Sequence, residues 1–243
     1  PNPPLIRFPT QNAMSVEMGD AFKSTIETIS ENKNIRATIL TGAGRAFSAG
    51  GDVEFLRARM ADTPVNNARE MMKFYKRFLC LRDLQVPIIA AINGHAIGAG
   101  FCVALACDQR IAATDSKIGL TFTKLGLHPG MGATHFLPQV THPDNASRLL
   151  LTGEIVNAKE ALELGIVGAL AEDPLEAALK RAEQIASAGP IAVQTCMRSL
   201  RKQMSRGLED SLWREADAQA QCYNSVDMQE GVSAIVEKRA PSF

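Results

Sequence analysis

The chain has 243 residues, 46% hydrophobic and 21% charged, which suits one substantial globular domain. Its 26 basic and 26 acidic residues balance, so there is no basic excess to neutralise phosphates, which argues against a nucleic-acid or acidic-membrane partner. The five cysteines are an odd number and include no C-x-x-C pair, which argues against a disulfide framework or a zinc ribbon and makes a reducing interior the expected setting. No apolar run reaches membrane-spanning length, so no membrane span is expected.

The N-terminal part of the chain predicts one short strand and one helix. Residues 5–8 are strand-like, and the chain starts at Pro1 without Met, so this end is expected to be incomplete. Ser15 suits the N-cap position of a helix. Four apolar residues at helical spacing form the expected buried face of that helix: Met18, Phe22, Ile26 and Ile29.

A first glycine-rich turn, T-G-A-G-R-A-F-S-A-G-G-D-V, occupies residues 41–53 and follows a strand-like run over residues 37–40. Residues 61–67 contain Pro64 and predict a loop that leads into a helix over residues 68–84. The large apolar side chains of that helix are expected to pack against the core rather than to line a pocket: Met71, Met72, Phe74 and Phe78.

A second glycine-rich stretch, N-G-H-A-I-G-A-G-F-C-V-A-L-A-C-D, occupies residues 93–108. It follows a predicted buried strand over residues 86–92 and continues into a short apolar helix. The first N–H groups of a helix have no internal partner and carry partial positive charge, so this turn suits an anion or an oxygen that becomes one. Gly98 and Gly100 have no side chain, which lets a ligand approach the backbone.

Two such turns after two strands predict that two N–H groups point at one oxygen. That arrangement forms an oxyanion hole for a thioester carbonyl. A dinucleotide site is not indicated, because the G-x-x-x-G-x-G spacing from Gly94 to Gly100 differs from G-x-G-x-x-G.

The remainder of the chain predicts strands and then helices. Strands are expected over residues 109–113 and 117–122, a helix over 153–164 and a short strand over 165–167. From Pro174 the chain is predicted to be helical, with Pro190 opening one helix and Gly207 separating it from the next. We therefore expect a core over residues 1–170 and a helical C-terminal region over 171–243 within one structural unit.

The two glycine-rich stretches resemble the enoyl-CoA hydratase/isomerase (crotonase) family, whose patterns are roughly F-x-A-G-x-D and N-G-x-A-x-G-G-G-x-E-L-A-x-x-C-D. Three further matches lie in order along the chain: N-A-M-S at 12–15, L-G-L-H-P-G-M-G-A-T at 125–134, and E-G with E-K-R-A-P at 230–241. One glycine motif alone would be weak, whereas five in order over almost the whole chain are specific.

The resemblance implies an α/β fold, with a crotonase-like β-β-α spiral core and a helical C-terminal trimerisation region. It implies an acyl-CoA small molecule as partner, with coenzyme A as part of the substrate and no tightly bound cofactor or metal. It also implies a homotrimer or homohexamer.

The resemblance assigns roles to particular residues. Gly51 and Ala99 match the two backbone donors of the oxyanion hole, and Ala at 99 in place of the usual Gly still has an N–H. Lys238 matches a position where a helix of a neighbouring subunit contacts coenzyme A. Four more residues match positions around the bound coenzyme A: Ala13, Ala49, Asp52 and Val53. For the side chain of Asp52 we favour capping of the following helix.

The chain departs from the family where its hydratases carry two glutamates. The matching positions hold Cys102 and Phe122, and residues 129–131 lack the carboxylates that some isomerases carry. Hydration requires a carboxylate to activate water and a carboxyl group to protonate carbon. Simple hydration is therefore not the expected reaction.

Two residues are candidate replacements for the missing glutamates. His128 is close in sequence to the expected pocket wall and could act near neutral pH, although a surface or supporting histidine is the favoured interpretation. Cys102 could be a nucleophile at a helix N-terminus, but a small buried residue in the space of the glutamate is favoured.

Three functions stay open at this point. The first is an enzyme that stabilises a thioester enolate, and the second is a non-catalytic acyl-CoA-binding protein. A remote third is an α/β-hydrolase with Ser48 as nucleophile, because A-F-S-A-G resembles G-x-S-x-G without its first Gly.

Overall fold

A computed structural model describes residues 11–243, and its strands form two four-stranded sheets. The order β1-β3-β5-β8 in the first sheet is parallel throughout. The second sheet has the order β2-β4-β6-β7, and only its β6–β7 pair is antiparallel. The strands are β1 Thr38–Thr41, β2 Ala46–Ser48, β3 Ile88–Ile92, β4 His95–Ile97, β5 Gln109–Ala113, β6 Lys117–Gly119, β7 Ile155–Asn157 and β8 Ala169–Ala171.

Consecutive strands alternate between the two sheets. β1, β3 and β5 belong to the first sheet, whereas β2, β4 and β6, which follow them in the chain, belong to the second. A helix follows each of the first two strand pairs. This strand–strand–helix winding confirms the predicted α/β spiral core.

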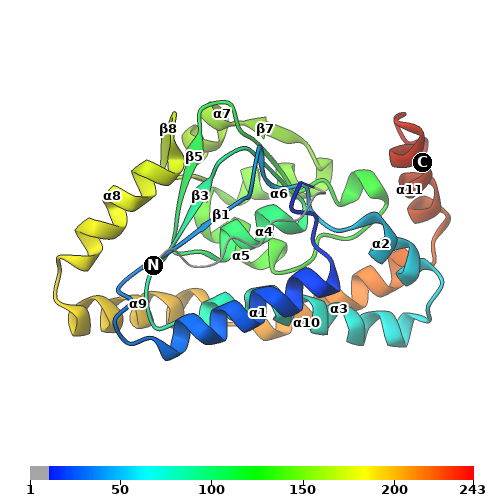
Figure 1. The fold of residues 1–243 in the computed structure, drawn as a ribbon. Helices are drawn as coiled ribbons and strands as arrows, with labels where there is room; N and C mark the ends of the chain where they lie inside the picture. Colours follow the sequence, from blue (N-terminus) through cyan, green and yellow to red (C-terminus); the bar gives the residue numbers. More distant parts are fainter. Residues whose placement is uncertain (1–10) are drawn as a thin grey trace.

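The helices surround these sheets. Figure 1 shows α1, α3 and α10 along one side, α8 and α9 toward one end, and α11 at the other. In the part of the chain that the structure describes, none of them is long and apolar enough to cross a membrane. Their bounds are α1 Val16–Glu31, α2 Val53–Met60, α3 Pro64–Leu79, α4 Ala99–Ala106, α5 Ala133–Val140, α6 Pro143–Thr152, α7 Ala158–Glu163, α8 Pro174–Ala186, α9 Pro190–Met204, α10 Leu208–Tyr223 and α11 Val226–Glu237, with 3₁₀ turns η1 Cys80–Asp83 and η2 Thr123–Leu125.

Strand β3 is buried on both faces, which explains its unbroken apolar sequence. Ile88, Ala90 and Ile92 belong to the main hydrophobic core. Ile89 and Ala91 belong to a second cluster on the other face of the strand. Helix α8 packs on that face and contributes Ala178 to the cluster. Because side chains of a strand alternate between faces, one strand supplies both layers.

Several predicted helix signals are confirmed. The Ser15 side chain accepts a hydrogen bond from the Met18 amide at 3.2 Å and so caps α1. The predicted apolar face of α1 packs on the main core. Pro190 is in the first turn of α9, and Gly207, with φ of 77°, separates α9 from α10.

Helix α3 begins earlier than predicted. The Thr63 hydroxyl accepts a hydrogen bond from the Asn66 amide, and Pro64 is in the first turn, where its missing N–H costs nothing. The proposed loop over residues 61–67 is therefore wrong from residue 64 onward. Near the other end, α3 stops at Leu79 and η1 continues to Asp83. The four large apolar side chains of α3 named above are all buried in the main core, which agrees with the packing interpretation.

Three other predicted elements differ from the structure. The strand predicted over residues 117–122 ends at Gly119, where the pairing with β7 ends and the chain turns into η2. Gly153 has φ of 59° and ends α6, so the helix predicted over 153–164 is replaced by β7 and α7. The strand predicted over 165–167 is a turn with φ of 76° at Gly165, and β8 follows it. The strand predicted over residues 5–8 lies outside the described residues.

Candidate functional site

The two glycine-rich turns lie side by side because β2 and β4 are paired. In this parallel pair Ala46 is opposite His95 and Ser48 is opposite Ala96. The residues that follow the two strands therefore leave the same edge of the sheet. The approach is close, since a Cβ atom built on Gly50 would lie 3.8 Å from the Ala99 nitrogen.

The Gly51 amide is free to face a ligand. Gly51 forms a parallel bridge with Met14, in which the Met14 amide donates to the Gly50 carbonyl at 2.7 Å and the Asp52 amide donates to the Met14 carbonyl at 3.1 Å. These bonds leave the Gly51 N–H unused by any hydrogen bond among residues 11–243. A Cβ on Gly51 would meet no atom within 4 Å, so the space beside it is open.

The Ala99 amide is a second donor that makes no hydrogen bond within the described part of the chain. Ala99 is the first residue of α4, so its N–H has no partner within the helix. Gly98 precedes it with φ of 53°, a conformation that favours glycine, and a Cβ there would also meet no atom within 4 Å. The two turns thus present two N–H groups, with open space beside Gly51 and Gly98, and such a pair of donors is the arrangement expected of an oxyanion hole.

Two asparagines support β2 and the segment that precedes it, and neither was assigned a role from the sequence. Asn93 Oδ1 accepts a hydrogen bond from the Gly42 amide at 3.0 Å, and its Nδ2 donates to the Gly44 carbonyl at 2.9 Å. The buried Asn12 Nδ2 donates to the Ala46 carbonyl at 2.8 Å. Both asparagines belong to motifs that match the family, N-A-M-S for Asn12 and N-G for Asn93. Membership of these motifs was the sequence signal that could have indicated a structural role.

Ser48 has a structural role. It is buried, its hydroxyl donates to the Asn12 carbonyl at 2.8 Å, and its oxygen accepts a hydrogen bond from the Gly50 amide at 3.2 Å. No histidine forms a hydrogen bond with Ser48 among the residues described. The structure therefore gives no support to the hydrolase alternative, which needs an exposed serine beside a base.

Most residues matched to coenzyme A contacts surround the first turn. Asp52 caps α2, because its carboxylate accepts hydrogen bonds from the amides of Glu54 at 2.8 Å and Phe55 at 3.2 Å. This confirms the preferred interpretation of its side chain. The other three are exposed or half-buried beside that turn: Ala13, Ala49 and Val53.

Lys238 is exposed and lies just after α11, with φ of 54°. Helix α11 packs against α2 and η2 of its own chain. The packing on η2 is tight, since a Cβ on Gly231 would lie 2.3 Å from the Leu125 carbonyl oxygen. Lys238 therefore lies at the end of α11, a helix that packs against α2, and α2 is the helix that follows Gly51.

Cys102 and Phe122 provide no acid–base chemistry in their present environment. Cys102 is fully buried, its thiol donates to the Gly130 carbonyl at 3.3 Å, and burial raises its pKa well above the usual value. The thiol therefore stays neutral, which agrees with the favoured interpretation of a small buried residue. Phe122 is buried in the same core cluster and precedes η2.

His128 is half-buried, and its ring forms a hydrogen bond with the backbone of the next residue. Nδ1 lies 2.6 Å from the Pro129 carbonyl oxygen, so this nitrogen donates a hydrogen. Burial lowers the pKa of the imidazole, which keeps it neutral near pH 7. No hydrogen bond among residues 11–243 joins the ring to either glycine-rich turn.

Helices α3 and α10 hold the loop over residues 128–134 through buried polar groups. Glu215 accepts hydrogen bonds from the Gly132 amide at 2.6 Å and from the Thr134 amide at 2.8 Å, while burial raises its pKa. The Tyr75 hydroxyl donates to Gln219 Oε1 at 2.8 Å, and Gln219 Nε2 donates to the His128 carbonyl at 2.8 Å. These contacts join segments far apart in the chain, so no local sequence signal indicates them.

The described residues contain no group of three or more His, Cys, Asp or Glu side chains that could hold a metal ion.

Comparison with known proteins gives one consistent result. The sequence profile of the family described as enoyl-CoA hydratase/isomerase matches residues 5–243. A crotonyl-CoA hydratase of Syntrophomonas wolfei is 33% identical over 96% of this chain and 89% of its own length. A 2,3-dehydroadipyl-CoA hydratase of Escherichia coli is 30% identical over 100% of this chain and 92% of its own. A solved enoyl-CoA hydratase/isomerase from Pseudoalteromonas atlantica superposes with a TM-score of 0.83 at 32% identity, covering 96% of this chain and 92% of that one.

Proposed function

Because this chain belongs to the enoyl-CoA hydratase/isomerase family, we propose that it binds an acyl-CoA thioester with the carbonyl oxygen between the amides of Gly51 and Ala99. The observation that carries the proposal is the pair of unused N–H groups at the edge of β2 and β4. Two donors aimed at one oxygen stabilise the negative charge of an enolate. The neighbouring residues of the first turn and Lys238 then contact coenzyme A.

The reaction differs from simple hydration. Cys102 is a buried neutral thiol and Phe122 an apolar ring, so neither activates water nor returns a proton to carbon. The remaining machinery suits reactions in which the substrate drives enolate formation, such as decarboxylation. The same observation supports a second candidate, a non-catalytic acyl-CoA-binding protein. Turnover of a panel of acyl-CoA thioesters separates the two.

Replacement of Gly51 by proline tests the oxyanion hole. Gly51→Pro removes one donor, and we expect the loss of turnover that accompanies about 3 kcal/mol of transition-state stabilisation. Proline also restricts the preceding residue, Gly50, whose φ is 95°, so some loss of thermal stability is expected beside the loss of the donor. Activity and thermal unfolding are measured together. A bound acyl-CoA whose carbonyl oxygen points away from both amides would refute the assignment.

We propose further that the helical region over residues 171–243 assembles the chain into a trimer or a dimer of trimers, as the family resemblance implies. In that assembly Lys238 contacts a phosphate of coenzyme A. Lys238→Ala is expected to weaken binding of coenzyme A by about 1 kcal/mol, measured by calorimetry at low salt. A monomer in light scattering would contradict the assembly, and unchanged affinity would contradict the lysine contact.

A further inference from the structure

Met131 has a backbone conformation that residues with a side chain rarely adopt. Its φ is 57°, and the next residue, Gly132, has φ of 79°. Glycine adopts this left-handed region without a penalty, whereas methionine has a Cβ that crowds the backbone. Met131 is also buried, with 1% of its surface exposed.

Both sides of Met131 are fixed by the surrounding structure. Before it, the Gly130 carbonyl accepts the Cys102 thiol at 3.3 Å. After it, the Gly132 amide donates to Glu215 at 2.6 Å. Gly130 is also pressed against α3, since a Cβ there would lie 2.4 Å from the Tyr75 hydroxyl oxygen. The loop therefore cannot relax by local movement, and strain held in this way is characteristic of functional sites.

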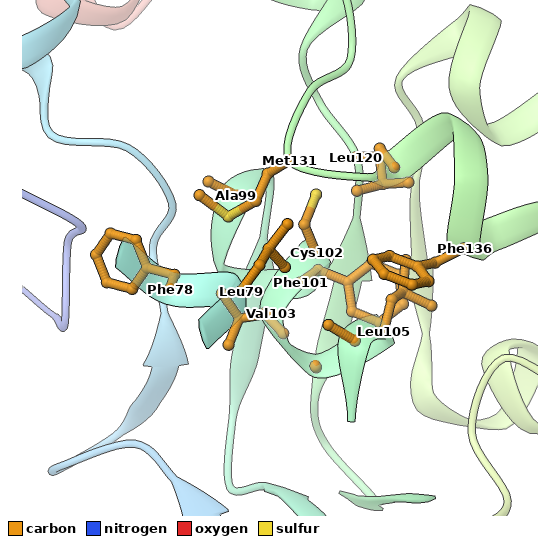
Figure 2. Packing of buried hydrophobic residues seen from close by; sticks show 14 of the residues in the cluster. Phe78, Leu79, Ala99, Phe101, Cys102, Val103, Leu105, Leu120, Met131 and Phe136 are labelled. Atoms are coloured by element: carbon orange, nitrogen blue, oxygen red, sulfur yellow. The ribbon is translucent and has the colours of Figure 1, made fainter. Parts of the chain in front are cut away.

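The Met131 side chain lies at the wall of the proposed thioester site. Cys102 is one turn along α4 from Ala99, so the bond from Cys102 to Gly130 places this loop over the start of α4. Figure 2 shows Met131 directed from its loop toward Ala99, with the sulfur of Cys102 directed toward the same loop. Phe78 and Leu79 of α3 belong to the same cluster.

Met131 and Ala99 thus belong to one buried cluster, and the flexible side chain of Met131 is directed toward the start of α4. Two cavities lie away from Ala99: one of about 10 Å³ is lined in part by Leu137 and Leu149, and one of about 190 Å³ in part by Arg110 and Arg181. An acyl chain attached to a carbonyl held at Ala99 has to share its path with Met131. Methionine is unbranched and flexible enough to yield to a short chain.

We propose that Met131 determines acyl-chain length, closing the acyl end of the site so that short acyl groups are accepted and long ones are excluded. This inference rests on the proposed thioester site. Truncation of Met131 opens the path, and the left-handed backbone makes glycine the best tolerated replacement. Leucine keeps the bulk.

The test is binding of butyryl-CoA and decanoyl-CoA, saturated thioesters, measured by calorimetry. The native chain and Met131→Leu are expected to bind butyryl-CoA at least about tenfold more tightly than decanoyl-CoA. In Met131→Ala and Met131→Gly that preference is expected to disappear or reverse, because burial of about two further methylenes is sufficient for a change of about tenfold. Met197→Ala, which truncates a buried methionine on α9, is expected to keep the native preference.

The possible results distinguish the role of Met131 from the proposed thioester site. Equal affinity of the native chain for both thioesters overturns the role of Met131 but leaves the thioester site intact. An unchanged preference in a folded Met131→Gly also overturns that role. Failure of the native chain to bind either thioester, or coenzyme A itself, overturns the proposed function and this inference with it.

Discussion

This chain is expected to hydrate crotonyl-CoA slowly. Compared with a hydratase that has both carboxylates, the rate is expected to be about 10²–10⁴-fold lower for each carboxylate that is absent. Water must lose a proton as it attacks Cβ, and Cα must receive one. Cys102 and Phe122 occupy the matching positions, and both are buried in the apolar core. Phe122 is also expected to occupy the space of the attacking water. The measurement is the loss of absorbance of the conjugated thioester.

The double variant Cys102→Glu, Phe122→Glu is expected to raise that rate. Its control is Cys102→Gln, Phe122→Gln, which adds polar groups of the same size without an acid or a base. The new carboxylate at 102 replaces a thiol that donates to the Gly130 carbonyl, and it comes close to Glu215. Its pKa is therefore expected to be raised, which suits a general acid. A native rate near that of ordinary hydratases would show that another residue, first of all His128, acts as the base.

The local parts of the site could be predicted from the sequence. A buried strand, a glycine-rich turn and a helix start within a few residues of each other are short-range signals that predict the two turns, and the family resemblance then assigns the donors to Gly51 and Ala99. The capping of α2 by Asp52 is equally local. That the two turns meet depends on the pairing of β2 with β4, which local signals do not specify and which the resemblance to known proteins supported.

The non-local parts could not be predicted. Glu215 lies on α10, where a single buried carboxylate among exposed polar residues does not alter the helical pattern. Its partners, Gly132 and Thr134, lie more than 80 residues earlier. The helix expected over residues 153–164 failed for a related reason. Gly153 ends α6 in a left-handed conformation, and pairing with β6 then makes Ile155–Asn157 a strand.

Replacement of Arg201 is expected to destabilise the fold more than any surface change. Arg201 is on α9 and binds Asp108 with two hydrogen bonds, from Nε to Oδ1 at 2.8 Å and from a terminal nitrogen to Oδ2 at 2.5 Å. Its remaining donors reach the carbonyl of Leu84 at 2.5 Å and that of Val86 at 3.2 Å. Asp108 Oδ2 in turn accepts the amide of Ile88, the first residue of β3. One guanidinium therefore joins α9 to the start of the central strand.

Arg201→Met retains most of the aliphatic volume but leaves a largely buried carboxylate and two or more carbonyls without their donors. Loss of one member of such a pair costs about 3–5 kcal/mol in the free energy of unfolding, measured by urea denaturation. Arg201→Lys keeps the charge without the planar fork, so an intermediate loss is expected. The matched control is Lys180→Met, which breaks an exposed pair with Glu176 on α8 and is expected to cost about 0–1 kcal/mol. A loss for Arg201→Met no larger than that control would show that the link from α9 to β3 contributes little. Partial recovery in Arg201→Met, Asp108→Asn would show that much of the cost came from the carboxylate left unpaired.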